Sequence, residues 1–257
     1  TILYHLNIPY VVDYDDAVFH RYNMHPRAVV RFLLGGKIDA VMRHAALVIV
    51  GNEYLGNYAR GAGAKQVAYI PSVIDLDRYQ VMPQPENPVF TIGWIGTPAT
   101  EKYLHLIHRA LSEVCKNGTA RLILVGSSHT ELPGVPMEVH AWSEETEVAE
   151  IQGFHVGIMP MPDSAWAQGK CGYKLIQCMA CARPVIASPV GVAQGIIEDS
   201  KNGFLAAATA DWVKAFCVLR EDRRLREGMG KAGRAKVERH YSLQIAAPML
   251  LSLLRSI

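Results

Sequence analysis

Short apolar runs alternate with amphipathic segments along most of the chain. In the first 79 residues, strands are predicted at Val11–Val12, Ala46–Val50 and Val67–Ile70, and helices at Pro26–His44 and Asn52–Arg60. Strands that alternate with helices indicate βαβ units and a parallel sheet. Three strands are too few for a stable doubly wound sheet, and the chain opens without an initiator Met. We therefore expect a fragment or a processed chain whose first α/β domain is incomplete.

A second series of strands and helices follows a proline-rich segment. Residues 82–88 contain three prolines, which disfavour both helix and sheet pairing. The strands predicted beyond it are Thr91–Ile95, Leu122–Val125, Met137–Val139, Val156–Met159 and Val185–Ala187. The helices predicted there are Thr100–Lys116, Glu144–Gln152, Tyr173–Ala182 and the region from Asp211 to Ile257. This pattern is typical of a Rossmann-like domain.

The expected organisation is therefore α/β, with two Rossmann-like domains built on parallel sheets. Residues 1–81 form the partial first domain, residues 82–89 a linker, and residues 90–240 the complete second domain. Residues 241–257 are expected to form a helix that packs back on the first domain. Ligands of open α/β sheets bind beyond the carboxyl ends of the strands, so the residues directly after each strand are the candidates for a site.

Charge and cysteine content narrow the function classes. The net charge is only +2, so no strong basic field favours a nucleic-acid partner. The five cysteines are scattered, which predicts no disulfide framework and favours a reducing, cytoplasmic compartment. No apolar run approaches the ~18 residues that a membrane-spanning helix needs, and no signal peptide is recognisable.

The segment from Asp163 to Cys181 carries the strongest chemical signal. It follows a predicted strand and enters a helix near Gly172. On helical spacing, Lys170, Lys174, Gln177 and Cys181 share one side. Two lysines in a first turn oppose the helix dipole unless an anion offsets them, and a diphosphate is a natural offset. An ordinary surface stripe is the alternative interpretation.

The loop GWIGTPAT (93–100) has a similar but weaker character. Gly96 allows close approach of the backbone to a ligand, and Thr97 or Thr100 can cap a helix or bond a phosphate. The loop matches neither G-x-G-x-x-G nor the P-loop pattern. A plain strand-to-helix turn is the alternative here.

Several motifs together resemble the group 1, family-4 glycosyltransferases. They are GNEYLGNYA (51–59), YIPSVID (69–75), GWIGTPAT (93–100), GKCGYKLIQCMAC (169–181), PVIASPVGV (184–192) and NGFLA (202–206), within a match that begins at VVDYDDAVF (11–19). The resemblance implies the GT-B fold, with a nucleotide diphosphate sugar bound by the second domain and the acceptor mainly by the first. It also implies retention of anomeric configuration and no metal or other cofactor.

The chain departs from the family pattern at Gly169 and Gln177, and also at Ala182, where relatives usually have glycine, and at Gly195, where an acidic residue is common. Many relatives carry two glutamates with seven residues between them, whereas this chain has Gly169 and Gln177 at those positions. In relatives the first contacts the donor sugar and the second the ribose; Asp163 could supply a missing carboxylate, and Gln177 can bond a hydroxyl as a neutral group. The resemblance places Gly172 and Tyr173, at the helix start, in the donor site as well.

Two tryptophans and an acidic turn complete the candidates. Trp142 and Trp166 are expected beside the cleft, where Trp166 could pack on the sugar or base, with core packing as the alternative for both. Asp15 and Asp16 either line the acceptor side or fix a turn, and Asp16 is the catalytic candidate. A D-x-D metal site at Asp13–Asp15 is disfavoured, because the surroundings resemble GT-B proteins.

Two further patterns favour structural interpretations. Cys178 and Cys181 have the spacing of half a zinc site, but they lie within a helix and no second pair exists. Residues 27–44 mix basic and apolar side chains and could contact an anionic membrane, yet Gly35-Gly36 interrupts them. A domain helix with a solvated basic face is the favoured reading of this segment.

The predicted function is transfer of a sugar to a glycan, lipid or other hydroxyl acceptor. The protein is expected in the cytoplasm, and any contact with a membrane is expected at its inner face. Lys170 and Lys174 would stabilise charge that develops on the leaving diphosphate. A nucleotide-sugar-binding module without transfer activity and a GT-B sugar-nucleotide epimerase are the alternatives. An NAD-dependent enzyme is disfavoured because the dinucleotide fingerprint is missing.

Overall fold

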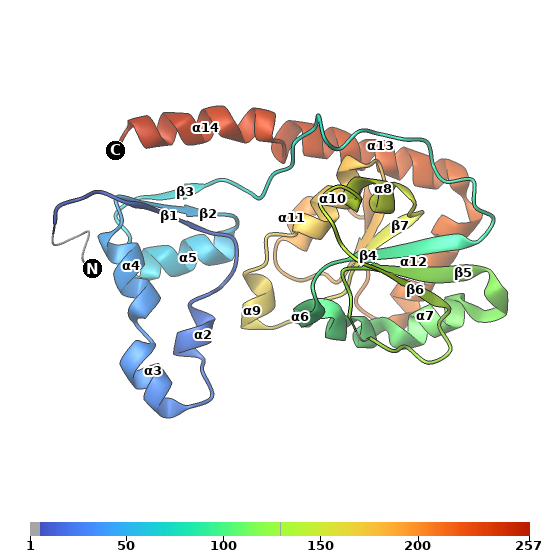
Figure 1. Cartoon of the computed structure of the whole chain (residues 1–257), viewed down its shortest axis with the longest axis horizontal. Coiled ribbons are helices and arrows are strands. Elements are labelled where there is room, and N and C mark those ends of the chain that lie inside the picture. Colours follow the sequence, from blue (N-terminus) through green and yellow to red (C-terminus); the bar gives the residue numbers. More distant parts are fainter. Residues whose placement is uncertain (1–5, 129) are drawn as a thin grey trace. The chain divides into compact units, whose positions relative to one another are not determined.

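A computed structural model describes residues 6–128 and 130–257, and the chain divides into two compact units (Figure 1). Unit 1 contains the residues up to Val73, residues 163–171 and residues 244–257. Unit 2 contains residues 74–162 and 172–243. The chain therefore passes between the units four times. One of these passages, between Cys171 and Gly172, falls inside the segment with the strongest sequence signal.

Unit 1 is built on a parallel sheet of three strands in the order β1-β2-β3. The strands are β1 (Val11–Tyr14), β2 (Leu47–Val50) and β3 (Val67–Tyr69). The helices are α2 (His20–Asn23), α3 (Ala28–Leu34), α4 (Lys37–His44), α5 (Glu53–Gly61), α9 (Ala165–Gln168) and α14 (Leu243–Arg255). The predicted strands of this half are confirmed, and β2 is buried along its whole length because it is the central strand.

The single helix predicted over residues 26–44 is wrong, because α3 and α4 are separate helices. Gly35 and Gly36 lie between them. A Cβ atom at Gly35 would collide with the carbonyl oxygen of Arg31, so the close turn at this point requires glycine. The glycine pair therefore ends α3 before α4 begins.

Unit 2 contains a six-stranded sheet with helices between its strands. The strands are β4 (Phe90–Ile95), β5 (Ala120–Val125), β6 (Met137–His140), β7 (Val156–Met159), β8 (Val185–Ala187) and β9 (Gly203–Leu205). The helical segments are α6 (Pro98–Glu101), η1 (Lys102–Ile107), α7 (His108–Val114), η2 (Lys116–Gly118), α8 (Glu147–Gln152), α10 (Tyr173–Ala180), α11 (Ala193–Ile196), α12 (Thr209–Glu221) and α13 (Arg223–His240).

The strand order β6-β5-β4-β7-β8-β9 identifies a Rossmann-like sheet. Its pairs are all parallel, and the order reverses direction between β4 and β7. Such a reversal opens a crevice beyond the carboxyl ends of the two strands, which is where ligands of open α/β sheets bind. The predicted Rossmann-like domain is thus confirmed, and β9 is a strand that the hydrophobic pattern did not predict.

Two groups of helices cover the sheet of unit 2. Helix α7 packs against α12, and α10 packs against α8 and α13 (Figure 1). The core between α7, α12 and the sheet includes Trp94, Trp212 and Phe216, each at most 2% exposed. The proline-rich segment contains no helix or strand, and the carbonyl oxygen of Pro83 accepts a hydrogen bond from the buried Arg183 at 2.9 Å. That bond fixes the segment to unit 2.

Within the described part of the chain, no helix combines the length and the apolar character that crossing a bilayer requires.

Unfolding of unit 2 should depend on pH through the buried His155. Its Nδ1 accepts from the Thr91 amide at 2.9 Å, so Nε2–H donates to the Pro85 carbonyl oxygen at 3.2 Å. Burial, assisted by the guanidinium of Arg226, lowers the pKa of His155 to about 4. An unfolded histidine titrates near 6.5, so the unfolded state takes up the proton first as the pH falls. The free energy of unfolding is therefore expected to fall by about 2 kcal/mol between pH 7 and pH 5 from this group.

Denaturant titrations at the two pH values measure that loss. The control is His155→Gln, whose amide can keep one donor and one acceptor without titrating. Its free energy of unfolding should show a smaller difference between pH 7 and pH 5. Equal differences in the wild type and the variant would contradict the assignment.

Candidate functional site

The ammonium group of Lys174 lies at the amino end of α10, directly above the ring of Trp94. Its Nζ is 4.1 Å from the ring centroid and donates to Thr100 Oγ1 at 3.1 Å. Helix α10 begins with Gly172 as its N-cap, at φ +71° and without a side-chain cap. The first amide groups of a helix have no intrahelical partner, and their dipole favours an anion. Lysine and helix together therefore make this position strongly electropositive.

Gly96 permits the lysine to reach the carboxyl end of β4. A Cβ atom at Gly96 would collide with Lys174 Nζ and with the indole of Trp94. Thr97 begins α6 as an exposed N-cap residue, and its hydroxyl makes no capping hydrogen bond. The predicted residues Gly96, Thr97 and Lys174 are thus brought together at the end of β4 beside the strand reversal, together with Trp94 and Thr100.

Gly172 is needed for conformation and for packing. Its positive φ disfavours side chains, and a Cβ atom would lie 2.5 Å from Ile196 Cδ1. The next residue, Tyr173, is 43% exposed at the helix start. The two residues therefore place the first turn of α10, with Tyr173 available to a ligand and Gly172 buried beneath.

A buried carboxylate, Glu147, organises the other side of this region. It is 5% exposed and accepts hydrogen bonds from the Tyr79 hydroxyl and from Trp142 Nε1, the latter at 2.7 Å. Arg78 Nη2 lies 3.2 Å from the same carboxylate. Burial and the bond to Glu147 raise the pKa of Tyr79, so the phenol stays protonated and donates. Trp142 itself is 52% exposed, and its indole N–H is already used. It can offer a ligand its ring face.

Gln177 belongs to the same network. It is 3% exposed, and its Nε2 donates to the Tyr79 hydroxyl at 3.0 Å. The structure thus connects Gln177, Tyr79, Glu147 and Trp142 through consecutive hydrogen bonds. Tyr79 and Glu147 were not singled out from the sequence, because 68 positions separate them and only the fold brings them together.

Lys170 forms an ion pair with Asp16 in unit 1. Lys170 Nζ lies 2.8 Å from Asp16 Oδ2, and the two side chains are 24% and 28% exposed. The ring of Trp166 has two cationic neighbours, Lys170 and Arg21, each 5.6 Å from the ring centroid. The predicted residues Asp16, Trp166 and Lys170 are therefore neighbours.

The backbone around Lys170 is fixed by close packing. Gly169 lies against Ala17, where a Cβ atom would be 2.5 Å from the Ala17 Cβ. The amide of Asn52 donates to the carbonyl oxygen of Lys170 at 3.1 Å. Asp163 accepts from Gln168 Nε2 at 2.7 Å, so its carboxylate stabilises the short α9. These contacts belong to unit 1.

The prediction that Lys170 and Lys174 share one side of a helix is wrong. Helix α10 begins at Tyr173, so only Lys174 lies in its first turn. Lys170 precedes the left-handed Gly172 and belongs to unit 1, whereas Lys174 belongs to unit 2. Helical spacing cannot be extended across a residue with positive φ.

The cysteines of this region are buried thiols. Burial, with the charges of Asp15 and Asp16, raises the pKa of Cys171 to about 12. Cys178 and Cys181 are buried in and at the end of α10, and burial raises the pKa of Cys181 to about 12 as well. Among the residues that the structure describes, no three His, Cys, Asp or Glu side chains are grouped to hold a metal ion.

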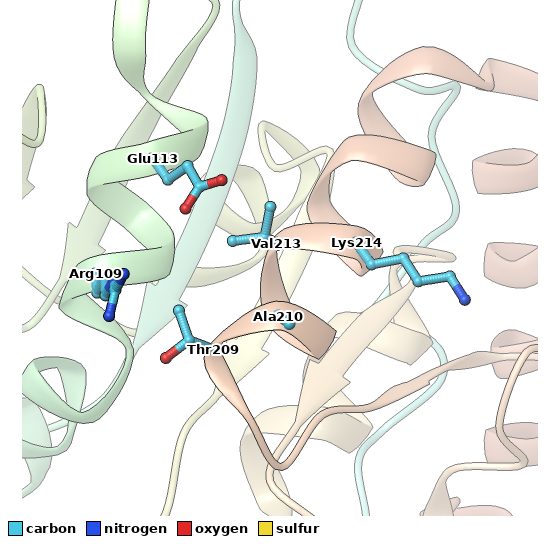
Figure 2. A pocket seen from close by; sticks show the side chains of 6 residues that line it. All are labelled: Arg109, Glu113, Thr209, Ala210, Val213 and Lys214. Carbon is cyan, nitrogen blue, oxygen red and sulfur yellow. The ribbon is translucent and has the colours of Figure 1, made fainter.

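A hollow of about 460 Å³ lies elsewhere in unit 2, between α7 and the start of α12 (Figure 2). It is lined by Arg109, Glu113, Thr209, Ala210, Val213 and Lys214. Figure 2 shows the side chain of Lys214 extending away from Arg109 and Glu113. Its charged groups therefore do not converge on one position, and none of the predicted site residues lines it.

Comparisons with solved structures show the fold. Sucrose-phosphate synthase from Thermosynechococcus elongatus is 17% identical with a TM-score of 0.74, over 96% of this chain and 67% of that protein. HepE from Anabaena, in complex with UDP and glucose, is 15% identical with a TM-score of 0.80, over 99% and 73%. TarM from S. aureus, as a variant in complex with fondaparinux, α-GlcNAc-glycerol and UDP, is 17% identical with a TM-score of 0.67, over 89% and 48%. These likenesses confirm the predicted GT-B fold.

Sequence comparison shows the family. No curated protein sequence matches the chain. The profile of the glycosyl transferases of group 1 matches residues 89–222, which is more than half of the chain and includes the β4–α6 loop and α10. The predicted family is thus confirmed, and the chain belongs to the group 1 glycosyltransferases.

Proposed function

We propose that this protein transfers a sugar from a nucleotide diphosphate sugar to a hydroxyl acceptor, with retention of anomeric configuration and without a metal ion. The observation that carries the proposal is the position of Lys174. Its ammonium group lies at the uncapped amino end of α10, beside the strand reversal of a Rossmann-like sheet. A diphosphate there accepts hydrogen bonds from the lysine and from the first amides of the helix, and the helix dipole favours its charge.

The donor site that we propose in unit 2 extends from this electropositive point. Gly96 and Thr97 provide backbone and hydroxyl groups close to the diphosphate, and Tyr173 contacts it from the first turn of α10. Trp142 offers its exposed ring to the base or the sugar, held in place by Glu147. Gln177 acts through Tyr79 rather than by direct contact, because its side chain is buried. The complexes of HepE with UDP and glucose support a uridine nucleotide as the first donor to test.

The chemistry follows from where charge develops. The bond between the anomeric carbon and the diphosphate breaks, and a bond to the acceptor oxygen forms on the same face. The leaving phosphate takes up the acceptor proton. Lys174 and the amides of α10 are in place before the reaction, so they stabilise the developing negative charge without reorganisation.

Unit 1 supplies the acceptor-side residues in this proposal. Asp16 and Lys170 form one ion pair, and Trp166 presents an aromatic ring next to it. Carboxylates and aromatic rings bind hydroxyl groups and sugar faces, respectively. Gly169 and Asp163 shape this region through backbone packing and the bond to Gln168. A glycan or lipid-linked acceptor fits these groups, and the complex of TarM with fondaparinux, α-GlcNAc-glycerol and UDP supports a carbohydrate ligand in addition to the nucleotide.

We place the reaction in the cytoplasm, at the inner face of the membrane where the acceptor is lipid-linked. The five cysteines are free thiols, which supports a reducing compartment.

Thermal unfolding in the presence of UDP, GDP, ADP and their sugars tests donor binding. One nucleotide is expected to raise the melting temperature clearly, since a ligand at 100 times its Kd adds about 2.7 kcal/mol to the free energy of unfolding. Inorganic sulfate serves as a control for unspecific anion binding. If no nucleotide or nucleotide sugar raises the melting temperature more than sulfate does, the proposed donor site is contradicted.

Loss of the two family glutamates favours one other function. With Gly169 and Gln177 in their places, the chain could bind a nucleotide sugar without transferring it. Product formation with an acceptor present separates these functions, since a binding module gives thermal stabilisation and no product. A sugar-nucleotide epimerase would convert the donor without any acceptor.

A further inference from the structure

Helix α3 exposes an apolar face that no described residue of unit 1 covers. Val29, Phe32 and Leu33 are spaced to share one side of the helix, and they are 68%, 88% and 69% exposed. None of the residues of α3 is buried. A helix of a folded domain normally buries its apolar face, so the interpretation of residues 27–44 as an ordinary domain helix is wrong for α3, whereas α4 buries Met42.

The segment that contains α3 is also basic. Residues 20–44 contain five Lys or Arg residues and one Asp, which gives a formal charge of +4. The whole chain carries only +2, so the remaining residues are net negative. The single carboxylate, Asp39, accepts a hydrogen bond from the Tyr58 hydroxyl at 2.6 Å. The segment that contains α3 therefore favours an anionic partner.

Local contacts hold α3 in this position. The guanidinium of Arg31 donates to the carbonyl oxygens of His25 and Pro26, at 2.6 and 3.0 Å. At the start of α4, the ammonium group of Lys37 lies 5.0 Å from the centroid of the Tyr22 ring. Figure 1 shows α3 at the end of unit 1 that is remote from the three-stranded sheet, with α4 between them. These contacts therefore hold α3, with its exposed apolar face, at this end of unit 1.

We propose that α3 docks on an anionic lipid surface, with Val29, Phe32 and Leu33 inserted at the level of the headgroups. An exposed Phe–Leu pair gains free energy by leaving water, and surrounding cations add attraction to anionic headgroups. A second copy of the chain is a poorer occupant, since two segments of +4 would repel each other.

Flotation of the chain with lipid vesicles tests this proposal independently of transfer activity, so it can fail while the proposed function stands. Binding is expected to vesicles of phosphatidylcholine mixed with phosphatidylglycerol, and to weaken as salt is added. The double variant Phe32→Ser/Leu33→Ser should bind at least about tenfold more weakly. Arg27→Gln, which removes one cation without touching the apolar face, should lower binding about fivefold.

A matched control is Leu106→Ser, which removes an exposed apolar side chain (55%) from unit 2 and should bind as the wild type does. Circular dichroism of each variant confirms that these surface changes leave the fold intact. Three outcomes overturn the proposal: no binding by the wild type, equal binding to pure phosphatidylcholine, or equal binding by the Phe32/Leu33 variant. A dimer in mass photometry that this variant abolishes would assign the face to a second copy instead.

Discussion

Replacing Lys174 by alanine is expected to lower kcat/KM for sugar transfer by about 10²–10³-fold, the usual cost of losing one preorganised charge-stabilising group. The side chain is held over Trp94 and bonded to Thr100, so its position is set before the donor binds. Because the leaving diphosphate gains charge as the bond breaks, the loss should fall mainly on kcat, with a smaller change in KM. Steady-state kinetics with the donor identified by thermal unfolding measure both constants.

Lys102→Ala is the matched control for this variant. Lys102 is also a lysine above an aromatic ring, 5.6 Å from the centroid of Tyr103, but it is exposed on η1. Its removal should leave kcat/KM within about twofold of the wild type, because isolated surface contacts of this kind contribute little. A Lys174→Ala variant that folds normally and retains wild-type kcat would show that the diphosphate binds elsewhere.

The hydrophobic pattern was sufficient to predict the scaffold of unit 2. Short apolar runs separated by helical segments identified β4, β5, β6, β7 and β8, and the rule for parallel sheets then directed attention to the residues after each strand. Gly96 and Lys174 were found in this way. The proximity of these two residues follows from the strand order, because both lie at the carboxyl edge of the same parallel sheet. It does not depend on side-chain packing.

The network around Glu147 could not be predicted in the same way. Glu147 lies in a helix whose sequence looks solvated, and its burial depends on Tyr79, which lies 68 positions away in the sequence, as well as on the nearby Trp142. No local pattern distinguishes a buried carboxylate from an exposed one until its donors are known.

The error at Lys170 has a local cause. Helical periodicity in a sequence assumes that the helix continues. The segment from Lys170 to Lys174 contains Gly172, and glycine adopts positive and negative φ about equally readily. Gly172 adopts φ +71°, so the chain turns and α10 starts only after it. The error at α3 is similar, since Gly35-Gly36 was recognised as an interruption but the exposure of the apolar face depends on packing that the sequence does not show.

Asp16→Asn and Lys170→Met are each expected to lower kcat by about 10²-fold if the ion pair takes part in the reaction as one unit. The pair is about a quarter exposed on each side, so its contribution to the free energy of unfolding should be about 1 kcal/mol or less. Kinetics and stability should therefore respond very differently to the same substitutions. Rates and melting temperatures of the two single variants and the double variant provide the measurement.

The double variant decides how the pair acts. Groups that work as a unit give non-additive losses, so Asp16→Asn/Lys170→Met should be scarcely slower than either single variant. Additive losses would indicate two independent contacts with the substrates. If Asp16 and Lys170 only stabilise a turn, the variants should have lower melting temperatures and wild-type rates. Trp166 gives an internal check, since loss of Lys170 removes one of its two cationic neighbours and should change its fluorescence in the folded protein.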